Sequence, residues 1–430
     1  MEKYVSVAMT PGITFDTSEF ADVDLFYFTI ELKESKRFCA DVTVGGSIVN
    51  HDIVPICKGK VYFGCCDKKT YCISLDGGLV WSFETGDVLV RPPAINEDMA
   101  YFGSYDENLY AVDADTGKLA WKFHADGRAV EPVIAGGRLY FCTLKGTLFC
   151  LNLRGEEIWK YKTNDLLFST PVIRNGAVYF GNEDGCLHAV SAETGKLLWK
   201  FPTGGWIRSM PAAFHNEKLY FGSIDKNLYA VRTDGTLAWK FRMGDVAGVP
   251  VVNEGIVYCG SRDANFYAID AESGRMIWKV PMPNFVSGQA CITDDAIYVG
   301  CWDCNLYKLN HKGGTVWKFP TKGYLNAGPS AHGDRLYFGC WDCNFYCIGK
   351  DGRLLWKFPM SITAQSRLLV EGPGTAKTIQ TVWRTEAESE KGRYKPGEGD
   401  IADYGTFSGQ YIDTTKSDYI SHKKKGYKSG

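Results

Sequence analysis

Tryptophan recurs through most of this 430-residue chain at spacings of 38 to 40 residues. Upstream of each recurring tryptophan lies a matching aromatic segment, such as Tyr62-Phe63-Gly64. A fixed period of this size is typical of repeat proteins, in which each unit packs only against its neighbours. The chain therefore contains eight copies of one unit over residues 52–359, marked by Trp81, Trp121, Trp159, Trp199, Trp239, Trp278, Trp317 and Trp356.

Each copy has the pattern of a small antiparallel sheet. The unit at residues 170–204 contains four short alternating segments, separated by Asn-Gly, Glu-Asp-Gly and Thr-Gly. These turn sequences supply the positive φ that tight hairpins need. One four-stranded sheet cannot cover both of its own faces, and repeated sheets with a period of about 40 residues are the blades of a β-propeller. We therefore predict an all-β fold with an eight-bladed β-propeller.

The two flanks differ from the repeats. Residues 1–50 hold two alternating segments, FADVDLFYFTIELK and RFCADVTVGG, which predict an N-terminal β extension in the form of a hairpin. We assign residues 51–370 to the propeller and residues 371–430 to a C-terminal tail. The tail begins with a strand-like stretch that includes Trp383 and then becomes too polar to fold alone. It is predicted to be extended, either as a partner-docking segment or as a disordered one.

Charge and composition exclude several classes of partner. The chain has 48 basic and 50 acidic residues, so no net field draws nucleic acid to it, except at the short basic C-terminus around Lys423–Lys425. No apolar run approaches the roughly 20 residues of a membrane helix, and the N-terminus lacks a signal-peptide core. The 15 cysteines are odd in number and scattered. We therefore expect a cytoplasmic protein with reduced thiols and no membrane partner.

The repeats also carry a recognisable motif. The segment Asp113-Ala-Asp-Thr-Gly117 leads to Trp121, and Ala192-Glu-Thr-Gly195 leads to Trp199. This pattern resembles the tryptophan-docking repeat of the PQQ-like β-propeller family, and the resemblance extends over all eight units. It implies the propeller fold. The family includes periplasmic quinoprotein dehydrogenases, an outer-membrane assembly lipoprotein that binds proteins, and propeller modules attached to other enzymes, so the function has to be argued from sites.

A vicinal cysteine pair invites comparison with the quinoprotein enzymes of that family, which the resemblance implies hold a Cys-Cys disulfide beside the quinone. In the repeat register, Cys65 occupies a slot that other units fill with small residues such as Ser104. We therefore interpret Cys65-Cys66 as packing residues and expect no cofactor. A quinone-dependent oxidoreductase with the cofactor in the central funnel, and a small-ligand sensor, remain as alternatives.

Two Cys-x-x-Cys motifs form the strongest candidate metal site. Cys301 and Cys304 lie in the expected turn between the second and third strands of one unit, and Cys340 and Cys343 lie in the equivalent turn of the next unit. Paired motifs of this kind are usual for structural zinc. Propeller symmetry would keep the two turns apart, and duplication of one unit explains their similarity. Zinc, a redox-active dithiol and simple structural thiols all remain open.

Tryptophan and arginine dominate interface hot spots. Such residues should gather in the loops at one end of the propeller, and we predict that this face docks a protein. The tail tyrosines are suited to the same purpose, because tyrosine offers apolar area and a hydroxyl. We therefore expect a non-catalytic binding or scaffold propeller in a larger assembly. The candidate partner-binding residues are Arg91, Arg128, Trp206, Arg208, Trp302 and Trp341 in the loops, and Tyr404, Tyr411, Tyr419 and Tyr427 in the tail.

Overall fold

The computed structural model describes residues 54–96, 98–326 and 328–360, together with strands at 13–16, 29–32, 38–44, 364–370 and 377–378. The chain divides into two compact units, of which the larger is Gly46–Ser361. The smaller unit combines Met1–Gly45 with Ile362–Gly430. The described residues form strands and turns with no helix, which confirms the all-β prediction.

The larger unit contains eight four-stranded antiparallel sheets, each built from one contiguous segment with its strands paired in chain order. We number these sheets as blades 1 to 8 and call the strands of each blade A to D. Blade 1 consists of β4 (Ile56–Cys57), β5 (Lys60–Gly64), β6 (Lys69–Ser74) and β7 (Leu79–Glu84), and blade 2 of β8 (Ala94–Ile95), β9 (Met99–Gly103), β10 (Asn108–Asp113) and β11 (Leu119–His124). Blade 3 consists of β12 (Val133–Ala135), β13 (Arg138–Thr143), β14 (Thr147–Asn152) and β15 (Glu157–Lys162), and blade 4 of β16 (Val172–Arg174), β17 (Ala177–Gly181), β18 (Cys186–Ser191) and β19 (Leu197–Pro202).

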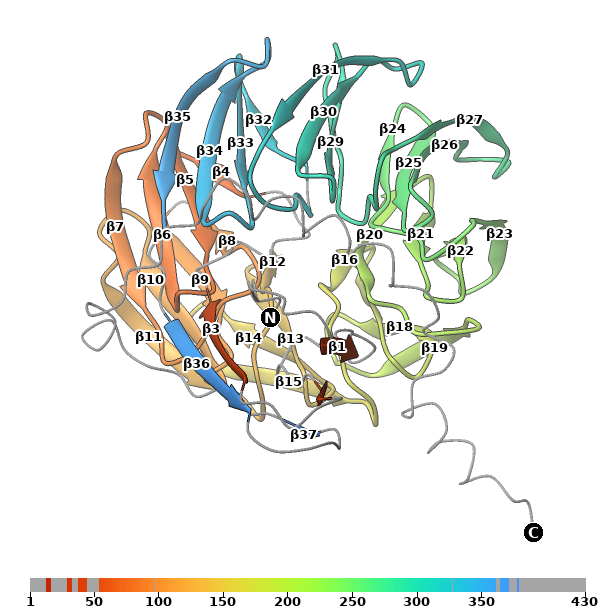
Figure 1. Ribbon diagram of the computed structural model, residues 1–430. Helices are drawn as coiled ribbons and strands as arrows, with labels where there is room; N and C mark the ends of the chain where they lie inside the picture. Colours follow the sequence, from red (N-terminus) through yellow and green to blue (C-terminus); the bar gives the residue numbers. More distant parts are fainter. Residues whose placement is uncertain are drawn as a thin grey trace. The chain divides into compact units, whose positions relative to one another are not determined.

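The remaining four blades repeat the same arrangement. Blade 5 consists of β20 (Ser209–His215), β21 (Lys218–Gly222), β22 (Asn227–Arg232) and β23 (Leu237–Arg242), and blade 6 of β24 (Val251–Asn253), β25 (Ile256–Ser261), β26 (Asn265–Asp270) and β27 (Met276–Pro281). Blade 7 consists of β28 (Cys291–Ile292), β29 (Ile297–Cys301), β30 (Asn305–Leu309) and β31 (Thr315–Pro320), and blade 8 of β32 (Ser330–His332), β33 (Arg335–Gly339), β34 (Asn344–Gly349) and β35 (Leu354–Pro359). Within this unit the blades follow one another around a central axis, with strand A innermost and strand D outermost (Figure 1). The eight-bladed prediction is confirmed.

The repeated tryptophan of strand D joins each blade to the next. The indole N–H of Trp81, for example, donates to the carbonyl oxygen of Ala114 in the C–D turn of blade 2 at 3.0 Å. Beneath the indole lies Gly117, whose φ of +69° favours glycine and where an added Cβ would meet the ring at 2.7 Å. All eight tryptophans make this bond, at 2.9 to 3.2 Å, with Ala114, Leu153, Ala192, Thr233, Ala271, His311, Lys350 and Leu75 in turn.

A β-bulge prepares the tryptophan for this contact. In every blade the pairing of strands C and D shifts by one residue just before the tryptophan, as between Ala111 and Val112 in blade 2. A bulge increases the local twist and re-aims the side chains that follow it. The bulge thus turns the indole toward the neighbouring blade.

The hydrophobic core lies between blades rather than within them. The cluster between blades 2 and 3 combines Tyr101 and Leu109 from one sheet with Phe141 and Phe149 from the next. The same kind of cluster joins the last blade to the first. Each blade therefore depends on two neighbours for burial of its faces, as expected for a repeat architecture.

The smaller unit corrects one prediction. Strand β1 (Ile13–Asp16) pairs with β2 (Thr29–Leu32), which also pairs with β37 (Lys377–Thr378), whereas β3 (Phe38–Val44) pairs with β36 (Ala364–Val370). The predicted hairpin between the two alternating segments is therefore wrong, because each segment finds a partner far away in the chain. Strand β36 belongs to this smaller unit although we assigned residues up to 370 to the propeller. The tyrosines of the tail lie outside the described residues.

Candidate functional site

The D–A loops and the B–C turns meet at one end of the blades, which we call the loop face. The backbone N–H of Trp341, in the B–C turn of blade 8, donates to the Tyr324 carbonyl of the preceding D–A loop at 3.3 Å. Trp302 donates to Phe285 in the same way at 3.0 Å. The six loop residues predicted to dock a partner all lie in these loops and turns. Five further junctions carry the same bond, namely Tyr105–Val88, Leu144–Arg128, Glu183–Leu166, Ile224–Trp206 and Arg262–Val246.

In six of the eight blades an aspartate of the B–C turn accepts a hydrogen bond from a tyrosine of strand C. In blade 2 the Asp106 carboxylate accepts from the Tyr110 hydroxyl and from the Gly86 backbone N–H of the preceding loop, each at 2.7 Å. In blade 5, burial and the hydrogen bond to Asp225 raise the pKa of Tyr229 to about 12. These aspartates are therefore structural, since their carboxylates are engaged within the protein. The same Tyr–Asp pair recurs as Tyr71–Asp67, Tyr267–Asp263, Tyr307–Asp303 and Tyr346–Asp342.

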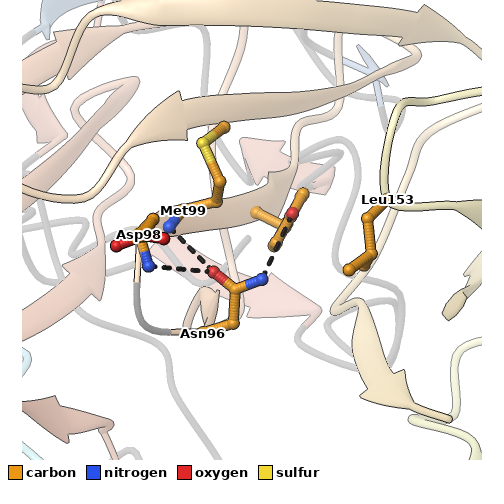
Figure 2. Close-up of a pocket in the computed structure, with 5 residues that line it drawn as sticks. Asn96, Asp98, Met99 and Leu153 are labelled. Atoms are coloured by element: carbon orange, nitrogen blue, oxygen red, sulfur yellow. Dashed lines mark hydrogen bonds between the residues drawn. The ribbon is translucent and has the colours of Figure 1, made fainter. Parts of the chain in front are cut away.

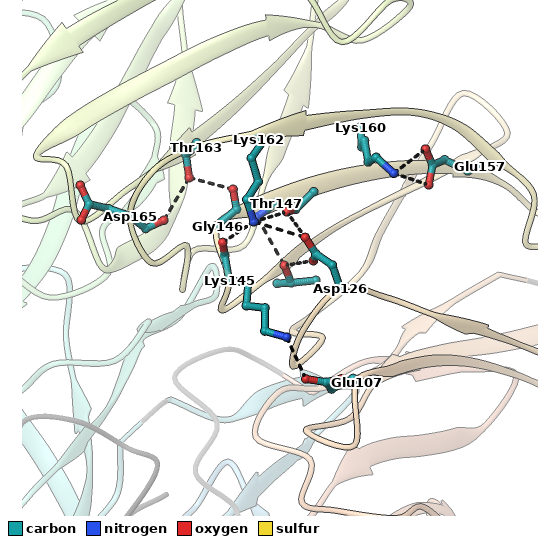
Figure 3. A network of polar contacts seen from close by, with 11 residues as sticks. Glu107, Asp126, Lys145, Gly146, Thr147, Glu157, Lys160, Lys162, Thr163 and Asp165 are labelled. Atoms are coloured by element: carbon teal, nitrogen blue, oxygen red, sulfur yellow. Dashed lines mark hydrogen bonds and ion pairs between the residues drawn. The ribbon is translucent and has the colours of Figure 1, made fainter.

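Blade 3 reverses this arrangement. Its B–C turn has Lys145 at the aspartate position, and the carboxylate comes from Asp126 in the preceding D–A loop. Asp126 accepts from the hydroxyls of Thr143 and Thr147 at 2.9 and 2.6 Å, and the Lys162 ammonium lies 3.3 Å away (Figure 3). Burial acts to raise the pKa of Asp126, but these hydrogen bonds outweigh it and hold the pKa below its ordinary value. The junction keeps a hydrogen-bonded carboxylate in either arrangement.

Four aromatic side chains pack together on the loop face of blades 7 and 8, and we call them the aromatic cluster. Trp302 is at the centre, with its ring centroid 5.3 Å from that of Tyr324 in a stacked arrangement. Its other neighbours are Phe285 at 5.6 Å and Trp341 at 5.7 Å. Tyr324 and Trp341 meet edge to face at 5.5 Å. Aromatic pairs at these separations contribute about 0.5–1.5 kcal/mol beyond area burial, so the cluster is held firmly.

A buried amide fixes the orientation of the central indole. The Trp302 indole N–H donates to Asn326 Oδ1 at 3.1 Å, and the Ser287 hydroxyl donates to the same oxygen at 2.7 Å. Asn326 is only 3% exposed, whereas Trp302 itself is partly exposed. The cluster therefore offers aromatic surface in a fixed orientation. Such pre-ordered groups lose little conformational entropy when a partner binds.

The predicted arginines serve mainly to tie the loop face together. Arg91 is 4% exposed, and its guanidinium lies 5.1 Å from the Phe168 ring centroid and donates to the Phe168 carbonyl at 3.4 Å. This contact links the loop after blade 1 to the loop after blade 3. Arg128 lies over Tyr105 at 5.2 Å. Both arginines are thus packed against aromatic rings of the same face.

The third arginine is held by an ion pair. Arg208 lies 4.6 Å from the Trp206 ring centroid, and its guanidinium is 2.6 Å from the carboxylate of Glu183 in the B–C turn of blade 4. Trp206 remains partly exposed. The structure therefore brings together two of the predicted groups, Trp302 with Trp341 and Trp206 with Arg208.

Sequence reasoning missed Phe285, Tyr324 and Asn326, which complete the aromatic cluster. The signal was present in the repeat register. The D–A loop slot that holds Phe285 and Tyr324 is occupied by Val88 and Val246 in other blades. Comparison of this loop slot across the units, in addition to the strand motifs, would have marked the aromatic positions.

The four cysteines proposed as a zinc site do not form one. Cys301 Sγ lies 3.4 Å from the Asn284 carbonyl, and Cys340 Sγ lies 3.3 Å from the Gly323 carbonyl, so each contacts its own D–A loop. Burial, with the nearby carboxylates of the turns, raises the pKa of Cys304 to about 11 and that of Cys343 to about 12. A raised pKa disfavours the thiolate that binds metal. In the parts of the chain that the structure describes, no group of three or more His, Cys, Asp or Glu side chains is arranged to hold a metal ion.

The vicinal cysteines show why a quinone site does not fit these residues. Cys65 is fully buried, with its Sγ 3.5 Å from Met360 Sδ in the core between blades 8 and 1. Burial raises the pKa of its thiol well above the usual value. Both Cys65 and Cys66 are free thiols. Between residues 54 and 360, leaving aside 97 and 327, every cysteine is a free thiol, so the disulfide implied by the quinoprotein resemblance is not present there.

A pocket of about 410 Å³ lies at the opposite end of the blades from the loop face, between blades 2 and 3. It is lined by Asn96, Asp98, Met99, Tyr101 and Leu153 (Figure 2). At four other junctions the equivalent tyrosine hydroxyl donates to a carbonyl of the next blade. Here the Tyr101 hydroxyl instead accepts a long hydrogen bond from Asn96 at 3.5 Å.

The docked tryptophans and contiguous four-stranded blades define the molecule as a PQQ-like β-propeller, as the repeat motif suggested. The chain belongs to the family described as the β-propeller of β-alanine-activating enzyme, whose model matches residues 25–254. A second model, described as outer membrane protein assembly factor BamB, matches residues 224–356.

Curated relatives come from different functional classes. The chain is 28% identical over 198 residues to β-alanine-activating enzyme of Drosophila melanogaster, which covers 40% of this chain and 20% of that protein. It is 33% identical over 159 residues to the dehydrogenase subunit of the quinone alcohol dehydrogenase of Gluconobacter oxydans, which covers 29% of this chain and 21% of that protein. The chain thus matches about a fifth of the length of each of these two relatives.

Among solved structures, BamB of Moraxella catarrhalis is similar, with a TM-score of 0.58 and 20% identity over 73% of this chain and 96% of that one. At this identity the likeness establishes the fold alone. Among the described residues, no helix has the length and apolar character needed to cross a membrane.

Proposed function

We propose that this chain is a non-catalytic protein-binding propeller whose loop face docks a partner protein. The observation that carries this proposal is the aromatic cluster of Phe285, Trp302, Tyr324 and Trp341. Three of its four rings are partly exposed while their orientation is fixed from within the fold. Rigid aromatic groups of this kind are the usual anchors of protein interfaces.

The second exposed aromatic site on the same face supports the proposal. Trp206 lies in the D–A loop between blades 4 and 5, and Arg208, which stacks on it, is itself held by Glu183. Trp206 thus presents a ring whose position is set by an ion pair. A partner that contacts both Trp206 and the aromatic cluster would lie across the loop face.

The relatives favour the same class of function. BamB is, by name, an assembly factor for outer membrane proteins, and a BamB family model matches residues 224–356, from the B–C turn of blade 5 to strand D of blade 8. This range contains all four residues of the aromatic cluster. The cytoplasmic location of this chain stays a prediction.

The test begins with native purification of the full chain and mass spectrometry of the proteins that co-purify. A candidate partner is then purified and titrated against wild type and against Trp302→Ala. Loss of a central aromatic anchor is expected to weaken binding by about 30-fold or more, as for an interface hot spot. Lys279→Ala serves as a control, because Lys279 is exposed on the outer strand of blade 6.

Folding has to be monitored in the same variants. Trp302→Phe keeps an aromatic ring but loses the bond to Asn326, so it should bind with an intermediate affinity. If wild type, Trp302→Ala and Trp341→Ala bind the partner with equal affinity, the aromatic cluster is not part of the interface. Circular dichroism and melting temperature establish that any loss reflects docking rather than unfolding.

The C-terminal tail is the second proposed contact. Its Tyr404, Tyr411, Tyr419 and Tyr427 stay predictions, since these positions lie outside the described residues. Truncation after Trp383 should leave the melting temperature of the propeller nearly unchanged and reduce partner binding. Undiminished binding by the truncated chain would exclude the tail from the interface, whereas a large loss of stability would show that it supports the fold.

A quinone-dependent oxidoreductase is the second candidate, because the identity to the Gluconobacter oxydans dehydrogenase subunit reaches 33%. The free thiols Cys65 and Cys66 do not match the disulfide that the resemblance implies beside PQQ. We therefore expect no dye-linked oxidation of alcohols or sugars after addition of PQQ and Ca²⁺. Turnover that disappears in a Cys65→Ser/Cys66→Ser variant would establish the oxidoreductase function instead.

A further inference from the structure

Strand D of every blade lies at the edge of its sheet, so one side of its backbone pairs with no other strand among those that the structure describes. Such an edge is a template for a strand from another chain, and proteins guard it with lysine or proline. The edges also carry exposed apolar side chains at their start. These include Leu119, Ile158, Leu197, Leu237, Met276, Val316 and Leu354.

Seven of the eight outer strands carry lysine, and some also proline, at this edge. The residue after the tryptophan is Lys122, Lys160, Lys200, Lys240, Lys279, Lys318 or Lys357, and each of these lysines is exposed. In four blades the strand also ends in a proline, which lacks the backbone donor that a ladder needs. The prolines are Pro202, Pro281, Pro320 and Pro359.

Strand β7 has neither form of protection. It reads Leu-Val-Trp-Ser-Phe-Glu and has the exposed Ser82 at the lysine position. Leu79 and Val80 at its start are 53% and 41% exposed. It is thus the one outer strand of the eight that has no basic residue and no proline, while its apolar residues are as exposed as those of the guarded strands.

We propose that β7 pairs antiparallel with β7 of a second copy of this chain, so that two first blades form one continuous eight-stranded sheet. A two-fold axis through Ser82 places this serine opposite its equivalent in the second copy, and Trp81 opposite Phe83. The same axis places Val80 opposite Glu84, so the two carboxylates lie at opposite ends of the pair. Two-fold dimers with a self-complementary surface are the commonest protein oligomers.

The charge pattern favours a second copy at β7 over a second copy at any other edge. In an antiparallel pair, directly opposite side chains have their Cβ atoms about 4.5–5.5 Å apart, and like charges there are destabilising. The same pairing at β11 or β19 would place lysine opposite lysine. At β7 it places two neutral hydroxyls together, which can hydrogen-bond to each other.

The test measures the oligomeric state of the full chain. Light scattering coupled to size exclusion, over a range of protein concentrations, should show a concentration-dependent dimer for wild type. Ser82→Lys introduces the missing guard, and the dissociation constant of the dimer should rise about tenfold or more because two like charges then face each other. Ser82→Thr stays neutral and should keep the dimer. Because Ser82 is exposed, the melting temperature should be the same in all three at protein concentrations low enough for each to be monomeric.

A cross-link tests the register. Ser82→Cys, treated with diamide, should give a disulfide-linked dimer, whereas Lys122→Cys at the same position of β11 should give none. A monomeric wild type, a dimer that survives Ser82→Lys, or equal cross-linking by both cysteine variants would overturn the proposal. The wild type could also be monomeric and bind another protein that the Ser82→Lys variant no longer binds. This result would assign the β7 edge to a strand of another protein, and it would overturn the dimer proposal as well.

Discussion

The indole N–H of Trp356, in the last blade, donates to the carbonyl oxygen of Leu75, in the first blade, at 3.1 Å. The same contact joins every other pair of neighbouring blades. Arg335 reinforces it through bonds to the Leu75 carbonyl and to Asp76, and the rings of Phe63 and Phe345 stack with centroids 4.3 Å apart. Among the described residues, the last blade is therefore joined to the first by side chains that contact one another and the Leu75 carbonyl.

Replacement of Trp356 by phenylalanine should lower the free energy of unfolding by about 1–2 kcal/mol, because one hydrogen bond and part of the buried ring are lost. Urea unfolding followed by circular dichroism measures the change. Trp317→Phe, at the junction of blades 7 and 8, is the matched control and should cost about the same. An unchanged stability of Trp356→Phe would mean that the seam is held by its other contacts.

The glycine beneath each indole gives a second prediction. Gly117 and Gly137 have nearly the same φ, +69° and +71°, but an added Cβ at Gly117 meets the Trp81 ring at 2.7 Å, whereas none of the protein lies within 4 Å of one at Gly137. Gly137→Ala should cost about 1–2 kcal/mol from backbone strain alone. Gly117→Ala should cost about 1–3 kcal/mol more, because the ring must move. Equal losses of stability for Gly117→Ala and Gly137→Ala in thermal unfolding experiments would show that the Trp81 ring can move without destabilising the protein.

Acid stability should depend on Asp126. Its pKa in the folded protein lies below the ordinary value, so its hydrogen bonds add stability above about pH 4 and this contribution is lost as the pH falls through the folded-state pKa. Asp126→Asn should therefore reduce the free energy of unfolding at pH 7. In this variant the free energy should also decrease less between neutral and acid pH than it does in wild type. Chemical unfolding at pH 3, 5 and 7 tests this. The same difference in unfolding free energy between wild type and variant at all three pH values would contradict it.

The thiols should react in order of exposure. Cys65, Cys142 and Cys340 are fully buried and have strongly raised pKa values, so they should resist iodoacetamide in the native protein and react on unfolding without a reductant. Cys304 is partly exposed with a pKa of about 11, so its rate should rise about tenfold per pH unit between pH 7 and 10. Mass spectrometry of the labelled peptides measures both. Native labelling of Cys65 ahead of Cys304 would contradict the burial order.

The repeat unit made the propeller predictable from the sequence. Strand order, turn positions and the role of Trp81 and its equivalents as blade contacts all follow from local patterns, which eight copies reinforce. The pairing of β3 with β36 was not predictable in this way, because alternation marks a strand but does not identify a partner more than three hundred residues away.

The loop face was predictable in position but not in detail. Residue type indicated Trp302 and Trp341, which do lie together. The same reasoning selected Arg91, which the fold uses internally against Phe168. Whether an arginine faces a partner or its own protein depends on contacts across blades, and the sequence of one loop does not contain them.

Because each blade is one contiguous segment and the last junction repeats the other seven, a further repeat can enter the ring without any strand changing its partner. Such an insertion only narrows the angle between neighbouring blades, from about 45° to about 40° for a ninth blade. The near-identical segments GCWDCNLYKL and GCWDCNFYCI in blades 7 and 8 have the form that an in-frame duplication leaves behind. The blade is thus the unit by which this molecule can change its size, and each new junction brings its own indole, glycine and carbonyl.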